Sequence, residues 1–200
     1  MSAVLDSSVD AGLYRWVVHA SQHTPAPLDD TVRFFSDYGL GLFAVLMLLA
    51  WWRARPADEG RMAAVLAVPL VVVVAYGAND VVKSIVGEQR PCRTLHVTGT
   101  VEACPGLGDY SFPSNHAAIA VAAAVALLFA DRRLGLVAAP FALALALSRV
   151  WIGVHYPHDV LAGIVVGVLV AWPLMSLTHF AAPLVARLRV TRLRPVLADS

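Results

Sequence analysis

Between two long apolar runs, the chain reads Ser148-Arg149-Val150-Trp151-Ile152-Gly153-Val154-His155-Tyr156-Pro157-His158-Asp159. This stretch brings an arginine, a histidine and an aspartate close together where two hydrophobic segments meet. Ionisable side chains at the edge of a membrane span cost free energy, so they usually mark a functional site. The stretch therefore predicts two membrane helices and a chemical site between them.

The composition of the chain is that of an integral membrane protein. Of its 200 residues, 58% are hydrophobic and 14% are charged, and the mean hydropathy is +0.68. A soluble domain of this length rarely has such a composition, whereas roughly 20 apolar residues cross a bilayer as a helix. The candidate spans are about Val32–Trp52, Met62–Val82, Pro113–Ala130, Leu134–Val154 and Val160–Phe180.

We expect an all-α fold, a polytopic membrane helical bundle of about five or six transmembrane helices, in a single domain over residues 1–200. The first candidate span is irregular because Arg33 and Asp37 lie near its start, and the third is short. Residues 11–20 combine apolar and polar side chains and predict a short interfacial helix before the first span.

The arginines predict how the chain is oriented. Cytoplasmic segments are enriched in lysine and arginine, and here the loops after the first and third spans and the tail after the fifth share one side. This alternation, loop by loop, is not expected if arginine merely ends helices. We therefore expect a cytoplasmic C-terminus with a basic tail over 181–200 and an extracytoplasmic N-terminus. The arginines are Arg53, Arg55, Arg61, Arg132, Arg133, Arg187, Arg189, Arg192 and Arg194.

This topology gathers the chemically active residues on one membrane face. The only lysine of the chain, Lys83, lies at the outer end of the second span, and Arg90 follows in the outer loop. His116 lies at the outer start of the third span, and segment 148–159 joins the fourth and fifth spans outside. We therefore expect a multi-pass protein of the cell (plasma) membrane whose site is extracytoplasmic.

Both cysteines, Cys92 and Cys104, fall in the same outer loop. An oxidising compartment permits a disulfide between them. The alternatives are two unpaired thiols or a metal pair, which would need more ligands than the sequence offers, because spacing in the sequence does not fix the separation of the Cα atoms. We favour the disulfide.

Two arginines and a lysine on one face predict an anion site. The planar guanidinium groups of Arg90 and Arg149 can each pair two phosphate oxygens, and Lys83 adds a point charge. The third span begins with the sequence of residues 113–116, and the unpaired N–H groups at a helix start bind anions. The candidate phosphate-binding residues are Lys83, Arg90, Ser114, Asn115, Ser148 and Arg149.

Two histidines and an aspartate supply the other groups that phosphoryl transfer needs. A neutral imidazole can attack phosphorus and form a phosphohistidine, and we assign this role to His155. Asp159 can accept a hydrogen bond from the other ring nitrogen and fix the tautomer. His116 then acts as the general acid toward the leaving oxygen.

Each of these residues also has a structural interpretation. Asp159 can interact with a helix dipole, Arg149 can extend to the interface, and His116 can be a satisfied polar group between helices. A metal site is a further alternative, because His116, His155, His158 and Asp159 include good ligands. The nearby cations would repel a metal, so we expect no metal and no cofactor, with His158 at the mouth of the site or at the interface.

The three segments resemble the signature of the type 2 phosphatidic acid phosphatase superfamily, which reads K-x6-R-P, P-S-G-H and S-R-x5-H-x3-D. The spacing within each motif matches, and one position departs, because Asn115 stands where the family has glycine. The family uses that backbone N–H on phosphate; asparagine retains it but adopts glycine-like torsions less readily. The matching residues are Lys83, Arg90, Pro91, Pro113, Ser114, His116, Ser148, Arg149, His155 and Asp159.

The resemblance implies a helical membrane phosphatase with a histidine nucleophile, a histidine acid and no metal. The resemblance also covers vanadium haloperoxidases, which share the site but are soluble. The hydrophobicity of this chain disfavours them. The chain looks most like bacterial undecaprenyl-diphosphate phosphatases, which implies hydrolysis of a polyprenyl diphosphate to the monophosphate. Phosphatidylglycerophosphate and phosphatidate phosphatases remain alternatives. We expect a lipid phosphate and the bilayer as partners, and no nucleic acid. The choice between a monomer and a homodimer stays open.

Two hypotheses belong to other classes. A transporter for an anion or a lipid would need polar residues that continue across the membrane, but the inner halves of the spans are almost wholly apolar. A lipid-binding protein without catalysis would need neither both histidines nor the aspartate. Phosphate release by the purified protein separates these hypotheses from a phosphatase.

Overall fold

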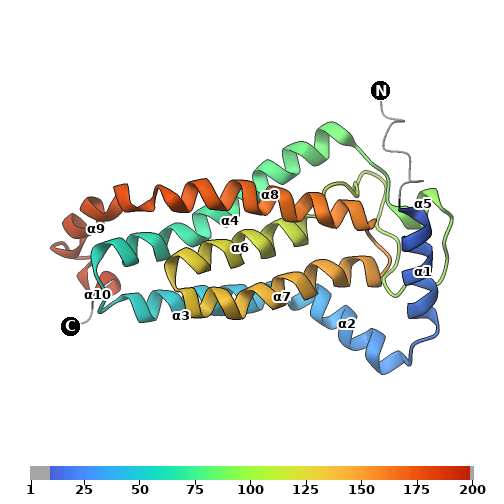
Figure 1. The fold of residues 1–200 in the computed structure, drawn as a ribbon, viewed down its shortest axis with the longest axis horizontal. Helices are drawn as coiled ribbons and strands as arrows, with labels where there is room; N and C mark the ends of the chain where they lie inside the picture. The colour runs from blue at the N-terminus through green and yellow to red at the C-terminus, as the bar shows by residue number, and fades with distance from the viewer. Residues whose placement is uncertain (1–9, 199–200) are drawn as a thin grey trace.

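The computed structural model describes residues 10–198, and this part of the chain consists of helices and loops (Figure 1). Residues 10–198 contain no strand, so the expected all-α fold is confirmed. The helices are α1 (Ala11–Gln22), α2 (Ala26–Tyr38), α3 (Leu40–Ala54), α4 (Glu59–Val86), α5 (Pro91–Thr94), α6 (Asn115–Ala130), α7 (Arg132–Trp151), α8 (Pro157–Ser176), the 3-10 turn η1 (Thr178–Ala181), α9 (Ala182–Arg189) and α10 (Arg194–Leu197).

Within the described residues, three helices are long and apolar enough to cross a membrane. They are α7, α8 and the stretch Glu59–Thr94 that begins with α4. Helices α2 and α3 meet at a bend of 50° and together form a fourth candidate. Helix α6 is apolar but has only 16 residues. The five predicted segments thus become three full spans, one bent pair and one short helix.

The first predicted span, Val32–Trp52, is not a single straight helix. It breaks at Gly39, whose N–H donates to Phe35 O at 2.8 Å. A Cβ at position 39 would clash with that carbonyl oxygen, so the tight bend requires glycine. The bend also separates the exposed pair Arg33 and Asp37 from apolar α3, which explains why the charges near the start of this span are tolerated.

Helix α6 lies in the middle of the bundle and contacts α3, α4, α7 and α8 (Figure 1). Most of its buried residues are alanines, which allow neighbouring backbones to come close. Helix α8 contributes Gly163 and Gly167, where an added Cβ would lie 2.5 Å from Ser114 O and 2.7 Å from Ala118 O, respectively. Because α6 is enclosed by other helices, it does not have to match the full thickness of the bilayer.

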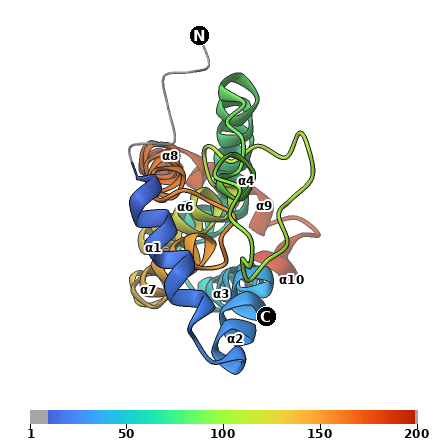
Figure 2. The ribbon, with the colours of Figure 1, turned by 90° about the vertical axis from the view of Figure 1, so that its right-hand side faces the viewer.

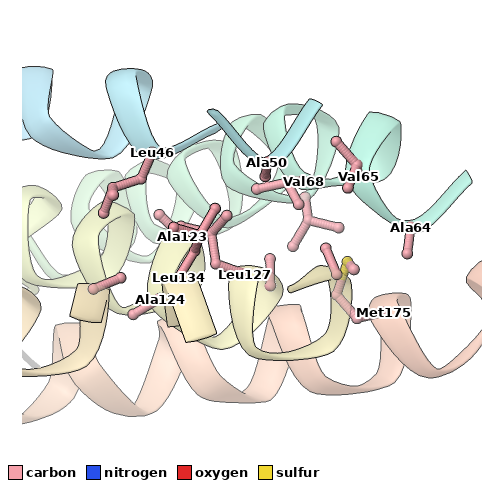
Figure 3. Close-up of a cluster of buried hydrophobic side chains, with 14 of the residues drawn as sticks. Leu46, Ala50, Ala64, Val65, Val68, Ala123, Ala124, Leu127, Leu134 and Met175 are labelled. Carbon is pink, nitrogen blue, oxygen red and sulfur yellow. The ribbon is translucent and has the colours of Figure 1, made fainter. Parts of the chain in front are cut away.

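Larger apolar side chains fill the space around α6, as the cluster in Figure 3 shows. The labelled side chains come from five helices, α3, α4, α6, α7 and α8. Inside a bilayer, such a cluster stabilises the fold by close packing rather than by removal from water. Its members include Leu46 and Ala50 of α3, Val65 and Val68 of α4, Leu127 of α6 and Met175 of α8.

Asp131 joins three helices at the end of the bundle opposite α1. Its carboxylate accepts from Arg53 Nε at 2.9 Å and Arg61 Nη2 at 2.7 Å, and it caps α7 through the N–H of Leu134. Burial alone would raise the pKa of Asp131, but the hydrogen bond from Leu134 and the two arginines hold it below its usual value. Two arginines predicted in the loop after the first span thus bind one carboxylate from two different helices, α3 and α4.

Helix α1 and the long loop after α4 cover the other end of the bundle (Figure 2). Tyr14 of α1 is buried and donates from its hydroxyl group to Gly153 O at 2.8 Å. The helix predicted over residues 11–20 is therefore present. In the loop, Cys92 and Cys104 form a disulfide with their Cα atoms 5.9 Å apart.

The contact between α6 and α8 can be tested with two helical glycines. Gly167→Val should destabilise the fold by about 1–3 kcal/mol, because the added carbons would overpack the interface with α6. Gly77→Val in α4 is the matched control, since a Cβ there would meet no atom within 4 Å. Thermal unfolding in detergent measures both. Equal losses of stability in the two variants would contradict the role of the α6–α8 contact.

Candidate active site

The predicted site residues meet around His155, at the end of the bundle that α1 crosses (Figure 2). His155 is buried, and the groups whose charges act on it are Arg90, Arg149, Lys83 and His116. Four segments supply these residues, namely α4, the N-cap of α5, the start of α6 and the end of α7. The structure therefore brings the three sequence motifs into one site.

Two glycines with positive φ direct the chain into this site. Gly87, with φ of +64°, ends α4 and turns the chain toward Arg90. Gly153, with φ of +87°, lies between α7 and His155, and a Cβ there would lie 2.5 Å from Thr100 Cγ2. Glycine adopts this conformation without steric penalty. Arg90 and His155 therefore each follow a turn that glycine permits.

The hydrogen bonds of His155 define its tautomer. Arg90 Nη1 lies 2.8 Å from His155 Nε2, and a guanidinium group can only donate. Nε2 must therefore accept, which leaves the proton on Nδ1. His155 Nδ1 lies 3.2 Å from Asp159 Oδ2 and donates to it. The lone pair of Nε2 thus points toward the guanidinium group of Arg90. A phosphoryl group would have to lie on this side of the ring to be attacked by Nε2.

The environment of His155 also keeps its ring neutral. Burial is the main cause that lowers its pKa well below the usual value, and the positive charges of Arg90, Arg149 and Lys83 add to the shift. A ring with a low pKa retains a lone pair at neutral pH. The geometry and the charge therefore both suit a nitrogen nucleophile.

Asp159 is fully buried, and one of its oxygens accepts three hydrogen bonds. Besides His155 Nδ1, the donors to Oδ2 are the backbone N–H of Tyr156 at 2.7 Å and the hydroxyl group of Ser111. Asp159 lies in the first turn of α8, and its bond from the N–H of Tyr156 closes that turn. The same carboxylate therefore orients the histidine ring and caps a helix.

The arginines are held by carboxylates of the outer loop and by groups from α2 and from the loop before α8. Arg90 Nη2 donates to Asp109 Oδ1 at 2.8 Å, and Arg90 Nη1 donates to Val154 O at 2.9 Å. Arg149 Nη1 donates to Ser36 Oγ at 2.8 Å and lies 3.7 Å from Glu102 Oε2. Each arginine thus faces a carboxylate.

Ser148 does not line the site as the sequence suggested. Its hydroxyl group lies 2.7 Å from Leu145 O and 3.1 Å from Ser36 Oγ. Ser36 is also the acceptor for Arg149, so Ser148 supports the arginine from behind. This arrangement favours an indirect role for Ser148 in phosphate binding.

The start of α6 is tied to the rest of the site. The backbone N–H of Ser114 donates to Asp159 O at 3.0 Å, so it is not available for phosphate as the sequence suggested. The Ser114 hydroxyl group is buried and has no hydrogen-bond partner within residues 10–198. Lys83 Nζ donates to Tyr110 O at 2.8 Å. Ser114 Oγ and the N–H of Asn115 in the first turn are therefore the donors left for an anion.

Asn115, where the family pattern has glycine, is part of a buried amide pair. Asn79 Nδ2 of α4 donates to Asn115 Oδ1 at 2.6 Å and lies 3.2 Å from Pro113 O. Asn79 is fully buried. The side chain that replaces glycine is thus held by a partner in another helix.

His116 stands apart from these networks. Within the part of the chain that the structure describes, its ring makes no hydrogen bond or ion pair, and it is only partly buried. A general acid must be able to reach a leaving group that arrives with the substrate. The position of His116 is compatible with that role.

Several residues of the site were not found from the sequence. No motif pointed to these residues, because all of them lie outside the three motifs. They are Ser36, Asn79, Glu102, Asp109 and Ser111. The one available sign was their polarity, at the ends of apolar segments or in the outer loop. Contacts across the bundle, rather than spacing in the chain, give these residues their roles.

Among residues 10–198, Glu88, His158 and Asp159 have ligand atoms within 4.8 Å of one another and form the one group with metal-ligand character. His158 Nε2 already lies 3.2 Å from both oxygens of Glu88, and Nδ1 lies 2.9 Å from Asp10 Oδ1. Both ring nitrogens are thus engaged by carboxylates. A metal would have to displace these contacts.

Comparisons with known proteins agree with this geometry. The PAP2 superfamily matches residues 64–183. The chain is 28% identical over 168 residues to the undecaprenyl-diphosphatase BcrC of Bacillus subtilis (strain 168), covering 84% of each chain. It is 31% identical over 159 residues to the bacitracin transport permease protein BcrC of Bacillus licheniformis, covering 76% of this chain and 75% of the relative.

The fold is also similar to a solved structure. The crystal structure of the transmembrane PAP2 type phosphatidylglycerolphosphate phosphatase from Bacillus subtilis matches with a TM-score of 0.60 and 19% sequence identity. The match covers 96% of this chain and 93% of that chain. The membrane helical bundle and the family resemblance read from the three motifs are thus confirmed.

The buried amide pair generates a test of the site. Asn79→Ala should lower kcat/KM about tenfold, because Asn115 Oδ1 and Pro113 O lose their donor and an unsatisfied buried group costs about 1–3 kcal/mol. Phosphate release by the purified variant measures the effect. Ser84→Ala, at an exposed position of the same helix, should behave as wild type. Unchanged kinetics in Asn79→Ala would contradict the role of the pair.

Proposed function

The chain belongs to the PAP2 superfamily of membrane lipid phosphatases, and on that premise we propose that it hydrolyses undecaprenyl diphosphate, or another polyprenyl diphosphate, to the monophosphate. Its similarity to an undecaprenyl-diphosphatase over 84% of both chains supports this substrate. The observation that carries the mechanism is the pair of bonds at His155, with Nε2 toward Arg90 and Nδ1 toward Asp159.

The first chemical step is attack of His155 Nε2 on the terminal phosphorus atom. A nitrogen–phosphorus bond forms, and the bond from phosphorus to the bridging oxygen breaks. His116 gives a proton to that oxygen, so the lipid monophosphate can leave. Asp159 stabilises the positive charge that develops on the ring of His155, and it does so through the Nδ1–H bond.

The second step returns the enzyme to its starting state. Water attacks phosphorus, and His116, now unprotonated, takes a proton from the water. The nitrogen–phosphorus bond breaks, its electron pair returns to His155 Nε2, and inorganic phosphate is released. Each histidine ends as it began, so the two steps together amount to the hydrolysis of one phosphoanhydride bond.

The cations of the site stabilise the charge on the transferred group. Arg90, Arg149 and Lys83 surround His155, and preorganised donors of this kind act where charge develops in the transition state. A phosphate that enters would replace Asp109 and Glu102 as partner of the arginines. Because three fixed cations already serve the phosphate, we propose that the chemistry is independent of a metal.

The site faces the extracytoplasmic side in this proposal. The arginines predicted to be cytoplasmic include Arg53 and Arg61, which bind Asp131 at the end of the bundle opposite the site. The positive-inside rule places that end in the cytoplasm. A diphosphate exposed on the outer leaflet could then reach His155 without crossing the membrane.

The roles of the two histidines can be separated by their substrates. His155→Ala should abolish turnover and the phosphoenzyme with every substrate. His116→Ala should lose about 10²–10⁴-fold activity on a substrate whose leaving group is a lipid alkoxide, such as phosphatidate. It should lose less activity on an activated aryl phosphate, whose leaving group needs little protonation. Phosphate release and acid-labile label trapped on the quenched enzyme measure these effects.

A matched set of substrates tests the lipid preference at the same time. The highest kcat/KM should be found with the polyprenyl diphosphate, ahead of phosphatidate and phosphatidylglycerophosphate. Label trapped in His155→Ala but absent from His116→Ala would show that the histidine roles are reversed. A preference for phosphatidylglycerophosphate would overturn the proposed substrate.

Cysteine accessibility tests the proposed face. In a background where Cys92 and Cys104 are serines, Pro56→Cys should resist an impermeant thiol reagent in intact cells, whereas Thr98→Cys should react. Both positions are exposed on the protein, at opposite ends of the bundle. Labelling after the cells are broken open is the control. The opposite pattern would place the active site in the cytoplasm.

A further inference from the structure

A largely buried cluster of three carboxylates, of which only Asp159 is fully buried, surrounds His158 next to the residues of the mechanism. Asp10 binds His158 twice, with Oδ2 accepting from the backbone N–H at 2.7 Å and Oδ1 lying 2.9 Å from Nδ1. Nε2 lies 3.2 Å from both oxygens of Glu88 and 3.5 Å from Asp159 Oδ1. The side chains of Asp10, Glu88 and Asp159 are 13%, 11% and 0% exposed.

The hydrogen bonds of this cluster require a protonated ring. A carboxylate can only accept, and a neutral imidazole has one donor nitrogen and one acceptor nitrogen. With Asp10 at Nδ1 and Glu88 at Nε2, a neutral ring would point a lone pair at a buried carboxylate. An imidazolium donates from both nitrogens and also offsets part of the negative charge. The geometry therefore favours His158 as a fixed cation.

The cation is well placed to act on Asp159. One carboxylate oxygen, Oδ2, takes the three donors described above, while Oδ1 is buried and has no hydrogen bond within residues 10–198. His158 Nε2 lies 3.5 Å from that oxygen and provides a positive charge beside it. The ring of His158 is held in place by Tyr156, which stacks on it with centroids 5.1 Å apart, and by Phe112 at 5.8 Å.

We propose that His158 is a positioning residue, an imidazolium that keeps Asp159 ionised and oriented toward His155. The inference rests on the proposed function, since it acts through the pair of Asp159 and His155. If Asp159 took up a proton, it would no longer be a full acceptor for the Nδ1–H of His155. The ring could then carry its proton on Nε2, and the attacking lone pair would be lost.

The titratable groups that face His158 come from each element packed against it. They are Asp10 before α1, Glu88 in the loop after α4, Asp159 in α8 and the phenol of Tyr156. All three carboxylates stabilise the imidazolium, and the imidazolium in turn disfavours a proton on Asp159. His158 therefore extends the pH range of activity toward lower pH.

The test compares pH profiles of purified full-length enzyme with an activated aryl phosphate as substrate. His158→Gln keeps a planar hydrogen-bonding group but removes the charge. At pH 6 its kcat should fall about tenfold with little change in KM, and the acid limb of kcat/KM should move up by about one pH unit, because Asp159 then binds a proton more readily. His19→Gln, at an exposed position of α1, should match wild type.

Glu88→Gln is the second variant and tests the charge without removing the ring. With one carboxylate fewer, His158 holds its proton less strongly and protects Asp159 less well, so kcat should fall more at pH 6 than at pH 8, where Asp159 is ionised in either case. A purely structural defect would lower kcat equally at both values. This variant keeps the test valid if His158→Gln does not fold.

Three outcomes would overturn the inference. The first is a wild-type profile in both variants while Asp159→Asn is inactive. The second is a pH-independent loss in both variants. The third is activation of the wild type by Mn²⁺ or Zn²⁺ that Glu88→Gln abolishes, which would assign the cluster to a metal. Full activity in Asp159→Asn would instead contradict the proposed function itself.

Discussion

The buried carboxylate of Asp159 is the point on which the active end of the protein depends. A carboxylate removed from water is stable only when donors and cations replace its hydration. Here one oxygen accepts from His155, Tyr156 and Ser111, and the other faces His158. These donors come from the loop before α8, from α8 itself and from the outer loop. The same electrostatic requirement therefore fixes the start of a helix, the path of a loop and the tautomer of the proposed nucleophile.

The cations of the site meet a related requirement. Burying Arg149 and Lys83 without partners would be costly, and in the structure they bind Ser36 and Tyr110 O, respectively. The carboxylates nearest to the arginines, Asp109 and Glu102, belong to the outer loop and are more exposed than the arginines. Partners of this kind can be exchanged for phosphate oxygens at a small cost. The cations that bind these partners are thus also the ones that the proposed function assigns to the phosphate.

Much of this site could be predicted from the sequence, because the motifs lie at helix ends and helix direction alternates in a membrane. Lys83, His116 and His155 were expected on one face for this reason, and they do meet there. The bend at Gly39 was not predicted, since hydrophobicity over a long segment does not reveal a change of direction. Nor were the contacts of Asn79 and Ser36, because no local pattern links residues on different helices.

The packing of small residues below the site explains why the motif segments meet so closely. Gly163 allows α8 to approach Ser114 O, and at this distance the N–H of Ser114 reaches Asp159 O. Any larger side chain at position 163 would separate the start of α6 from the start of α8. The start of α6 and the proposed nucleophile, His155, would then move apart, although no polar residue had changed. The geometry of the candidate site is therefore set by apolar contacts within the bundle, where close packing between helices, and not the hydrophobic effect, holds the helices together.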